Sequence, residues 1–434
     1  MKLSDLKGKK ICILGFGREG KAMLEAISAV GIDCEITIAD KKSEIQSTKF
    51  ETVSDLEFRI SDFQTGENYL SNLDRFDVII RSPGVFPSPE LEEVKDKITN
   101  STQIFLDSVP NSTVIGITGS KGKSTTASLL YEILKKADKD VHLVGNIGHP
   151  AIEKLCAPFD YAQGDKIYVV EMSSYQLMHC SSSPQIAVAT SFFPEHLDYH
   201  GSLEAYKEAK MNIARFQSKN DIIFCAEDAK DIASVSPGKQ ISFSASESPV
   251  SINETRLIGN HNLINIAAAY LVAKNLEVPD GVSLEVIKNF QCLPHRLQPC
   301  GEHHGIEWVD DSISTTPESA IAALDALGDS VYTLILGGQD RGNDFSALAD
   351  RVARSNVSNV VLMSESGARI GAELEKATAL VNIHRSDSMA DAVSWAKANT
   401  KKSKLCLLSP ASPSYGMFEN FEERGESFLN CILS

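Results

Sequence analysis

The sequence lacks paired cysteines and any long apolar run. None of its nine cysteines stands in a Cys-x-x-Cys pair, and Cys12, Cys225 and Cys406 lie inside short apolar runs. That pattern is typical of thiols that serve as small buried hydrophobes in a reducing compartment. No stretch approaches the roughly 20 apolar residues of a membrane helix, and the apolar run near the N-terminus is too short for a signal peptide. We therefore expect a cytoplasmic protein without a membrane partner.

Positive charge is also scarce. The formal net charge is −16 over 434 residues, and a surface of this sign repels nucleic acid. We therefore expect no nucleic-acid partner, and we expect local cationic pockets to bind any anionic substrate. A chain of this length predicts two or three domains, and its 42% hydrophobic and 23% charged residues are ordinary for a globular protein.

Short β-branched runs alternate with amphipathic helical patterns along most of the chain, which favours an α/β fold with largely parallel sheets. We predict strands at 11–14, 35–39, 77–81, 114–118, 167–171, 186–190, 221–225, 331–336, 359–363 and 405–409. We predict helices at 18–30, 124–137, 203–217, 260–275, 317–328 and 388–398. The polar segment 226–256 is expected to form an insertion or a small sheet of its own.

Glycine-rich turns follow three of the predicted strands, at Gly15 to Gly20, Gly116 to Gly122 and Gly337 to Gly342. We interpret each turn as the first turn of a separate domain. Domain boundaries are expected near 107–112 and 294–301, because both segments contain proline and turn-forming residues.

The second of these turns has the features of a phosphate-binding loop. It fits the short pattern G-x-x-G-K-[ST] through Gly119, Gly122, Lys123 and Ser124, whereas Ile117 stands where the full Walker pattern has its first glycine. Backbone N–H groups in such a loop cradle phosphates, the lysine neutralises their charge and the serine hydroxyl can bind Mg²⁺. The loop therefore predicts binding of a nucleoside triphosphate.

The first turn fits G-x-G-x-x-G through Gly15, Gly17 and Gly20, and Asp40 ends the next predicted strand. A dinucleotide-binding fold places its ribose-binding acid at that position. The pattern requires only a pyrophosphate at a helix N-terminus, so NAD and other nucleoside diphosphates are both compatible with it.

Other residues carry weaker signals. Glu171 ends an apolar strand after the phosphate loop, where it could bind Mg²⁺ or simply face solvent. His196 and His200 are spaced to share one helix face; zinc would need a third ligand that is not evident, so a role for His196 at a Mg²⁺ site is favoured. From the residues alone, Lys210 is a solvated helix lysine, and Arg296 either places a cation near a transferring phosphate or forms a surface ion pair.

Taken in order, the motifs resemble the Mur ligase family over about residues 8–430. The chain is most similar to the MurD branch, which joins glutamate to UDP-N-acetylmuramoyl-L-alanine. The motifs that carry the resemblance are TGSKGKSTT, VGNIG, EMSSYQL, EHLDYHG, EAK, GNHN, LPHR, DDS, GGQDRG and SPASPS.

The resemblance implies three domains. These are a Rossmann-like UDP-binding domain over 1–109, a central ATP-binding domain with a mainly parallel sheet over 110–297, and a Rossmann-like glutamate-binding domain over 298–434. It also implies a monomeric ligase of peptidoglycan precursor synthesis that uses ATP and two Mg²⁺ ions. ATP would convert the alanyl carboxylate into an acyl phosphate, which the glutamate amine then attacks.

The resemblance further implies residue roles. Catalytic residues are expected at Lys123, His196, Lys210 and Arg296. ATP contacts are expected at Gly119, Ser120, Lys121, Gly122, Lys123, Ser124, Thr125, Asn262, Arg296 and Asp311. Contacts to the UDP substrate are expected at Gly15, Phe16, Gly17, Arg18, Asp40, Ser82, Pro83, Gly84 and Asn146. Glutamate contacts are expected at Thr315, Arg341, Ser414 and Phe421, and metal ligands at Ser124, Glu171, His196 and Lys210, the last as a carbamate.

The chain departs from the usual family pattern at several positions. Lys121 replaces an asparagine in the phosphate loop, Ser191 and Glu195 replace Asn and Asp before the histidine, and Ile313 and Arg341 stand at two lysine positions. The motif DSISTTP is similar to the less common subgroup that adds L-glutamate. We favour D-glutamate as the amine, with L-glutamate as the alternative.

Three other functions compete with this one. A folylpolyglutamate synthase would not explain the N-terminal G-x-G-x-x-G domain. An NAD-dependent dehydrogenase would not explain the phosphate loop. A non-catalytic nucleotide switch would turn over ATP slowly whatever acceptor is present.

Overall fold

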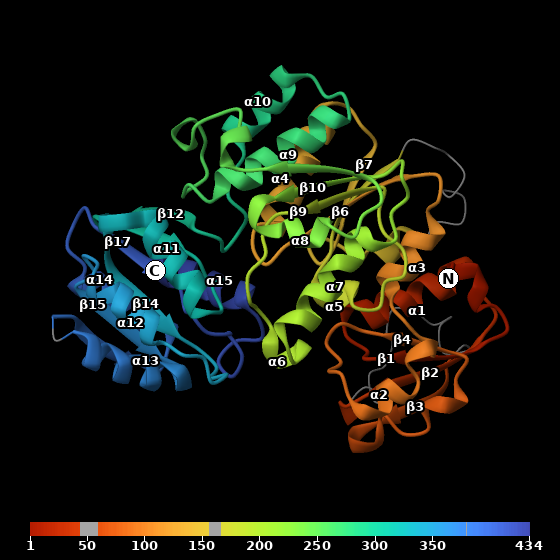
Figure 1. The fold of residues 1–434 in the computed structure, drawn as a ribbon. Coiled ribbons are helices and arrows are strands. Elements are labelled where there is room, and N and C mark those ends of the chain that lie inside the picture. Colours follow the sequence, from red (N-terminus) through yellow and green to blue (C-terminus); the bar gives the residue numbers. More distant parts are fainter. Residues whose placement is uncertain (44–59, 156–165, 379) are drawn as a thin grey trace. The chain divides into compact units, whose positions relative to one another are not determined.

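The computed structural model describes residues 1–43, 60–155, 166–378 and 380–434 (Figure 1). It contains three β-sheets, one within each of the ranges 1–109, 110–297 and 298–434, as expected for a three-domain α/β protein. Two compact units hold these sheets. The first unit comprises 1–251 and 263–288, and the second comprises 252–262 and 289–434. The boundaries at 109/110 and 297/298 stay predictions.

The N-terminal sheet has the order β3-β2-β1-β4-β5 and all its pairings are parallel. Its strands are β1 Lys10–Leu14, β2 Glu35–Asp40, β3 Ile60–Thr65, β4 Val78–Arg81 and β5 Ile98–Thr99. Its helices are α1 Arg18–Val30, α2 Pro89–Glu93 and α3 Ser101–Ser108. The central β1 is buried along four of its five residues, as expected for a parallel sheet covered on both faces.

The central sheet has the order β11-β10-β9-β6-β8-β7 and is also parallel throughout. Its strands are β6 Thr113–Thr118, β7 Val141–Gly145, β8 Ile167–Glu171, β9 Ile186–Ala189, β10 Ile222–Ala226 and β11 Lys239–Phe243. Its helices are α4 Lys123–Lys136, α5 Ser174–Leu177, α6 Leu197–His200, α7 Leu203–Arg215, α8 Lys230–Ala233, α9 Asn262–Asn275 and α10 Asp280–Asn289.

The third sheet has the order β12-β13-β17-β14-β15-β16, and only the β12–β13 pair is antiparallel. Its strands are β12 Gln298–His303, β13 Ile306–Asp310, β14 Val331–Gly337, β15 Asn359–Met363, β16 Asn382–Ser386 and β17 Leu405–Leu408. Its helices are α11 Pro317–Leu327, α12 Ser346–Ala353, α13 Ser364–Ala377, α14 Met389–Asn399 and α15 Phe421–Leu433.

Alternate residues of the third sheet enter two separate cores. Leu334 and Leu336 pack with the cluster that holds α11, α12 and α13. Ile335 packs with the cluster that holds α14 and α15. Because successive strand residues point to opposite faces, this domain is a three-layer sandwich of helices, sheet and helices.

The predicted strands and helices are confirmed to within two residues at each end. One expectation is wrong. Residues 226–256 do not form a small sheet of their own, because β11 pairs in parallel with β10 and extends the central sheet. Within the described residues, no helix is long and apolar enough to cross a membrane.

Candidate active site

A cavity of about 640 Å³ lies at the carboxyl ends of the N-terminal strands, in the first unit. All predicted UDP contacts except Phe16 line it: Gly15, Gly17, Arg18, Asp40, Ser82, Pro83, Gly84 and Asn146. The cavity is also lined by residues that were not predicted, among them Tyr69, Phe86 and Gln176. The two aromatic rings provide flat apolar surfaces for a ligand ring.

The glycine turn at this cavity is fixed by close packing. Gly15 has φ +87°, and a Cβ there would lie 2.8 Å from Val85. A Cβ on Gly20 would lie 2.3 Å from the Gly15 carbonyl oxygen, whereas one on Gly17 would meet nothing within 4 Å. Asp40 accepts a 2.6 Å hydrogen bond from the backbone N–H of Phe16. The acid therefore holds the turn itself, and the space over Gly17 stays open to a ligand.

The phosphate loop joins β6 to α4. A Cβ on Gly119 would lie 2.1 Å from the Thr190 hydroxyl, and one on Gly122 would lie 2.2 Å from Oδ1 of Asn265. Helix α4 begins at Lys123, whose Nζ donates to the carbonyl oxygens of Gly119 at 2.9 Å and Ser120 at 3.0 Å. The lysine charge therefore lies over the loop, which is the place where phosphates bind to a glycine loop that precedes a helix.

The segment after β9 holds the outer side of this loop. Backbone N–H groups of Ser120 and Lys121 donate to the carbonyl and hydroxyl oxygens of Ser191, at 3.0 and 2.8 Å. Lys121 pairs with Glu195 at 2.6 Å. Burial raises the pKa of Glu195, but the Lys121 ion pair and the neighbouring cations lower it by more than burial raises it. The pKa of Glu195 therefore falls below its usual value. The ion pair therefore neutralises the Lys121 charge at the outer side of the loop.

Lys210 corrects one interpretation made from the residues alone. Its side chain is not solvated: it is 1% exposed, and its Nζ donates to the Gly119 carbonyl oxygen at 2.8 Å. The ammonium also lies 4.8 Å from the centre of the Tyr206 ring. Two effects lower the pKa of Lys210 well below its usual value: burial is the main cause, and repulsion from Lys123 is the second. A neutral amine is the form that can react with carbon dioxide.

Glu171 lies at the end of β8 and is 1% exposed. Its Oε1 accepts a 2.9 Å hydrogen bond from the Asn146 amide, while its Oε2 is buried without a hydrogen-bond partner in the described structure. An unpartnered buried carboxylate oxygen fits a divalent cation as its ligand. Across the described ranges, no three His, Cys, Asp or Glu side chains gather into a metal-binding group, so such an ion would also need hydroxyl and phosphate oxygens.

The two predicted histidines flank a single helical turn. His196 precedes α6 and His200 ends it. Both rings lie against the same two tyrosines, Tyr175 and Tyr206, at centroid distances of 5.1 to 6.3 Å. Burial lowers the pKa of both histidines, that of His200 to about 4. The neutral imidazole is therefore the favoured form at neutral pH.

Of the other predicted nucleotide contacts, Ser124 and Thr125 lie in the first turn of α4 in the first unit, whereas Asn262, Arg296 and Asp311 belong to the second unit. Asp311 is buried, and it accepts hydrogen bonds from the Leu297 N–H at 3.1 Å and the Ser409 hydroxyl at 2.8 Å. Burial raises the pKa of Asp311 to about 6. The guanidinium Nε of Arg296 is buried without a hydrogen-bond partner in the described structure. Asn262 donates to the Ile258 carbonyl oxygen at 2.8 Å.

The predicted glutamate contacts follow strand ends of the third sheet. Ser414 is buried after β17, whereas Arg341 is exposed after β14, with its guanidinium 5.8 Å from the centre of the Tyr415 ring. Phe421 begins α15 and accepts a hydrogen bond from the Ser312 hydroxyl at its carbonyl oxygen. Thr315 is half-buried in the loop before α11.

Arg424 was not predicted, although it organises these loops. It is 2% exposed, and its guanidinium donates to the carbonyl oxygens of Ser312 at 2.8 Å and Ser412 at 3.0 Å. It therefore joins the loop after β13 to the loop after β17. Its position three residues after Phe421 and four before Phe428 places it on the apolar face of α15, and that spacing was the available signal.

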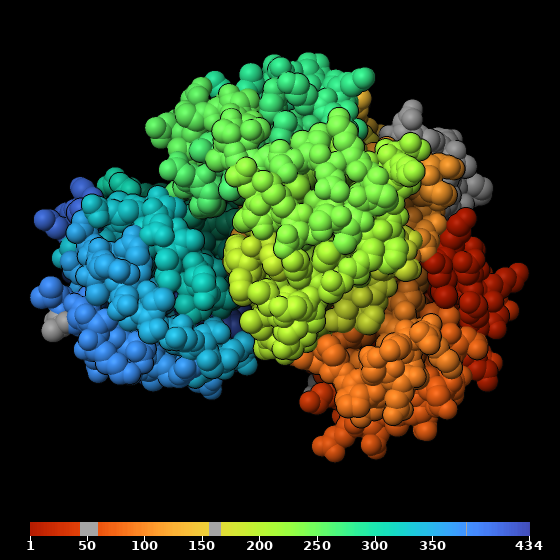
Figure 2. Space-filling view, in the orientation of Figure 1, coloured from red at the N-terminus to blue at the C-terminus, as the bar shows by residue number. Residues whose placement is uncertain are grey.

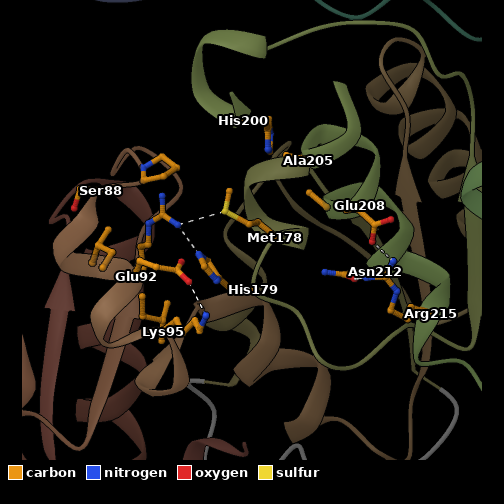
Figure 3. Close-up of a pocket in the computed structure, with 15 residues that line it drawn as sticks. Ser88, Glu92, Lys95, Met178, His179, His200, Ala205, Glu208, Asn212 and Arg215 are labelled. Carbon is orange, nitrogen blue, oxygen red and sulfur yellow. Dashed lines mark hydrogen bonds and ion pairs between the residues drawn. The ribbon is translucent and has the colours of Figure 1, made fainter. Parts of the chain in front are cut away.

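A second cavity, of about 400 Å³, also lies in the first unit (Figure 3). Residues of α2, α7 and the segment around His179 line it. Lys95 pairs with Glu92 at 2.6 Å, and Arg215 pairs with Glu208. The cavity contains none of the predicted UDP contacts, so it is separate from the larger one.

These features define a nucleotide-dependent enzyme built from three α/β domains. The models for the Mur ligase middle domain and for the Mur ligase glutamate ligase domain match residues 117–253 and 295–412. A UDP-N-acetylmuramoylalanine--D-glutamate ligase of Clostridium tetani is 32% identical over 98% of this chain and 96% of its own. A UDP-N-acetylmuramoyl-L-alanine--L-glutamate ligase of Salinispora tropica is 33% identical over 100% of this chain and 99% of its own.

Solved structures share the fold. The MurF ligase of Thermotoga maritima, in complex with ADP, has a TM-score of 0.60 at 18% identity and covers 99% of this chain and 96% of its own. E. coli FolC, also with ADP, has a TM-score of 0.54 at 17% identity but covers 83% of this chain and 95% of its own. The chain belongs to the Mur ligase family. It is an ATP-dependent ligase. This excludes two of the competing functions, an NAD-dependent dehydrogenase and a non-catalytic nucleotide switch.

Proposed function

We propose that this protein joins glutamate to UDP-N-acetylmuramoyl-L-alanine at the expense of ATP, in peptidoglycan precursor synthesis. Full-length relatives of both glutamate specificities carry this activity in their names. The observation that carries the proposal for this chain is the convergence of Lys123 and Lys210 on the Gly119 carbonyl oxygen. Lys123 supplies a positive charge that suits the transfer of a γ-phosphate to a carboxylate, and the Lys210 amine lies at the same loop, where a carbamate would provide an oxygen ligand for a metal ion.

The UDP moiety would occupy the 640 Å³ cavity. Its diphosphate would lie over Gly17 at the N-terminus of α1, where backbone N–H groups and the helix dipole favour anions. Arg18 would add a positive charge. Asn146 lines this cavity and also donates to Glu171, so the acceptor would extend from the cavity toward the phosphate loop.

Two Mg²⁺ ions fit the donor groups around the phosphate loop. Ser124 and the free oxygen of Glu171 would hold one, and His196 with a carbamylated Lys210 would hold the second. Carbamylation converts a buried amine into an anionic oxygen donor, the ligand type that Mg²⁺ prefers. The ions would supply charge neutralisation for the phosphates and the acceptor carboxylate.

The reaction needs ATP because an amine does not displace oxide from a carboxylate. The alanyl carboxylate attacks the γ-phosphate of ATP, which forms an acyl phosphate and releases ADP. The glutamate amine then attacks the acyl carbon, and the tetrahedral intermediate expels phosphate and loses a proton to leave the amide. Lys123 and Arg296 would reduce repulsion among these anionic groups, and the backbone of the loop would hold the phosphates in line.

Glutamate would bind to the second unit, at Thr315, Arg341, Ser414 and Phe421, with Arg424 holding the loops that carry them. We favour D-glutamate. L-glutamate is the second candidate, because DSISTTP contains Ile313 where an ammonium is usual and Arg341 replaces a lysine. A planar guanidinium and an ammonium hold carboxylates differently, so these two residues bear directly on which isomer fits.

Phosphate release tests the proposal. Purified protein is given ATP, Mg²⁺ and UDP-N-acetylmuramoyl-L-alanine, with D-glutamate, L-glutamate or no amino acid. We expect release that depends on one glutamate isomer, together with a product whose mass exceeds that of the acceptor by one glutamyl residue. Release that is the same in all three reactions would contradict the proposed function.

A further inference from the structure

The turn that lines the larger cavity is attached to α6 through the Tyr199 hydroxyl. This hydroxyl lies 3.0 Å from the Pro83 carbonyl oxygen and 2.9 Å from the Val85 carbonyl oxygen, so its proton is shared between them. Nη2 of Arg81 donates to the same hydroxyl at 2.8 Å. One buried side chain of the central domain thus fixes the backbone of a turn in the N-terminal domain.

Arg81 supports the same turn from the end of β4. It is 4% exposed, and its Nε donates to the Val85 carbonyl oxygen at 3.1 Å. Its Nη1 contacts Met178 and His179, and all three residues line the second cavity. None of the ion pairs among the described residues involves Arg81. A buried charge with only neutral partners is costly, which indicates that its rigid fork of donors serves to join these segments.

The surfaces of the two domains meet at this point. Figure 2 shows the yellow-green surface of the central domain directly against the orange surface of the N-terminal domain, within the first unit. Tyr199 also packs edge-on against Tyr175, at a centroid distance of 4.3 Å, and lies 4.9 Å from Phe86. The contact is therefore packed as well as hydrogen-bonded.

From Tyr199 the connection continues to the phosphate loop. The backbone N–H of Tyr199 donates to the His196 carbonyl oxygen at 3.1 Å, within the single turn of α6. The His196 ring lies 3.8 Å from one carboxylate oxygen of Glu195, and the other oxygen pairs with Lys121 of the loop at 2.6 Å. The short turn around α6 therefore contacts the turn at the cavity through Tyr199 and the phosphate loop through Glu195.

We propose that Arg81 and Tyr199 are positioning residues that couple acceptor binding to nucleotide binding. An acceptor in the larger cavity fixes the turn at Ser82 to Val85. Through the Tyr199 hydroxyl it then fixes His196 and Glu195 against the phosphate loop, so that each ligand binds more tightly when the other is present. This inference rests on the proposed function, because it requires that the acceptor and ATP occupy these two sites.

Binding measurements test the coupling directly. The affinity for the non-hydrolysable analogue AMP-PNP is measured by calorimetry with and without UDP-N-acetylmuramoyl-L-alanine, in the absence of glutamate. We expect the acceptor to tighten nucleotide binding by about fivefold or more, and the nucleotide to tighten acceptor binding by the same factor. Tyr199→Phe keeps the packed ring and removes the hydroxyl. It should bring this factor to within about twofold of unity, and each ligand alone should bind within about threefold of wild type.

Tyr270→Phe is the matched control, because it removes a hydroxyl that pairs with Asp280 between α9 and α10, and it should leave the factor unchanged. Arg81→Lys keeps the charge but loses the fork of donors, so it should also bring the coupling factor close to one. It replaces Tyr199→Phe in the test if that variant does not fold. A wild-type factor of one, or an unchanged factor in the folded variants, would overturn the inference. Failure of the wild-type protein to bind the acceptor at all would overturn the proposed function instead.

Discussion

The side-chain amide of Asn146 donates a 2.9 Å hydrogen bond to Oε1 of Glu171 and leaves the other oxygen of that carboxylate buried without a described partner. Asn146 lines the larger cavity, and Glu171 ends the strand next to the phosphate loop. One hydrogen bond therefore connects a residue of the proposed UDP site with a residue of the proposed metal site.

Glu171→Gln tests the proposed metal site. The amide keeps the size of the side chain but removes the anionic oxygen, so we expect phosphate release to fall by about 100-fold and the Mg²⁺ requirement to rise. Activity is measured against Mg²⁺ concentration. Glu285→Gln, which changes a surface ion pair with Lys136, is the control. Equal Mg²⁺ dependence in the two variants would remove Glu171 from the metal site.

Lys210→Ala tests the proposed carbamate. The substitution removes the anionic ligand and leaves space at the loop, so we expect activity to fall by about 100-fold and to recover in part when a short carboxylate such as acetate is added. Lys207→Ala lies on the same helix and loses only an ion pair with Asp231 at the surface. It should show neither the loss nor the recovery. Full activity of Lys210→Ala would exclude the carbamate.

Gly122→Ala tests the need for a glycine in the phosphate loop. Gly122 has φ +89°, and the added Cβ would lie 2.2 Å from Oδ1 of Asn265, so we expect nucleotide affinity to fall by about tenfold or more and stability to drop by about 1–3 kcal/mol. Gly281→Ala in α10 meets nothing within 4 Å and should be neutral or stabilising by up to about 1 kcal/mol. Calorimetry and urea unfolding measure both effects.

Asp311→Asn tests the effect of a buried carboxyl group on stability. Burial raises the pKa of Asp311 to about 6 in the folded protein, above the value of about 4 expected in the unfolded chain. The folded state therefore binds the Asp311 proton more tightly than the unfolded chain does. The resulting stabilisation of the folded state is complete below about pH 4 and is lost as the pH rises through about 6. We expect wild type to lose on the order of 2–3 kcal/mol relative to Asp311→Asn across that window.

Urea unfolding of both proteins from pH 4 to 8 measures this difference. A gap between wild type and variant that stays constant with pH would show that Asp311 titrates alike in the folded and unfolded chain.

The glycine turns and the strands before them could be predicted from sequence because their causes are local. Gly20 is required by the Gly15 carbonyl oxygen within its own turn, and Gly15 and Gly122 have positive φ values that favour glycine, although the atoms that their Cβ would meet belong to the distant residues Val85 and Asn265. Such turns have recognisable spacings. The parallel sheets followed from apolar runs that alternate with amphipathic helices. The sequence could not reveal that β11 joins the central sheet, since its residues are mostly exposed and polar.

Burial of charged side chains was the harder part. Lys210 lies four residues after Tyr206 and three before Ile213, both of which are buried, so helical spacing places it on the buried face of α7. Residue type alone suggested the opposite, because buried lysines are rare. The bond between Asn146 and Glu171 depends on how neighbouring strands of the sheet end, and no spacing in the chain encodes it. The family resemblance singled out both residues without predicting their contact.

The chain passes between the two compact units three times, at 251/252, 262/263 and 288/289. The short segment 252–262 carries Ile258 into the core of the second unit before the chain returns to form α9. A fragment that begins at residue 298 therefore leaves part of that core behind. A single proteolytic cut at 251/252 leaves α9 and α10 covalently attached to the second unit while they pack in the first. The two units are thus connected so that neither can be released by one break in the backbone.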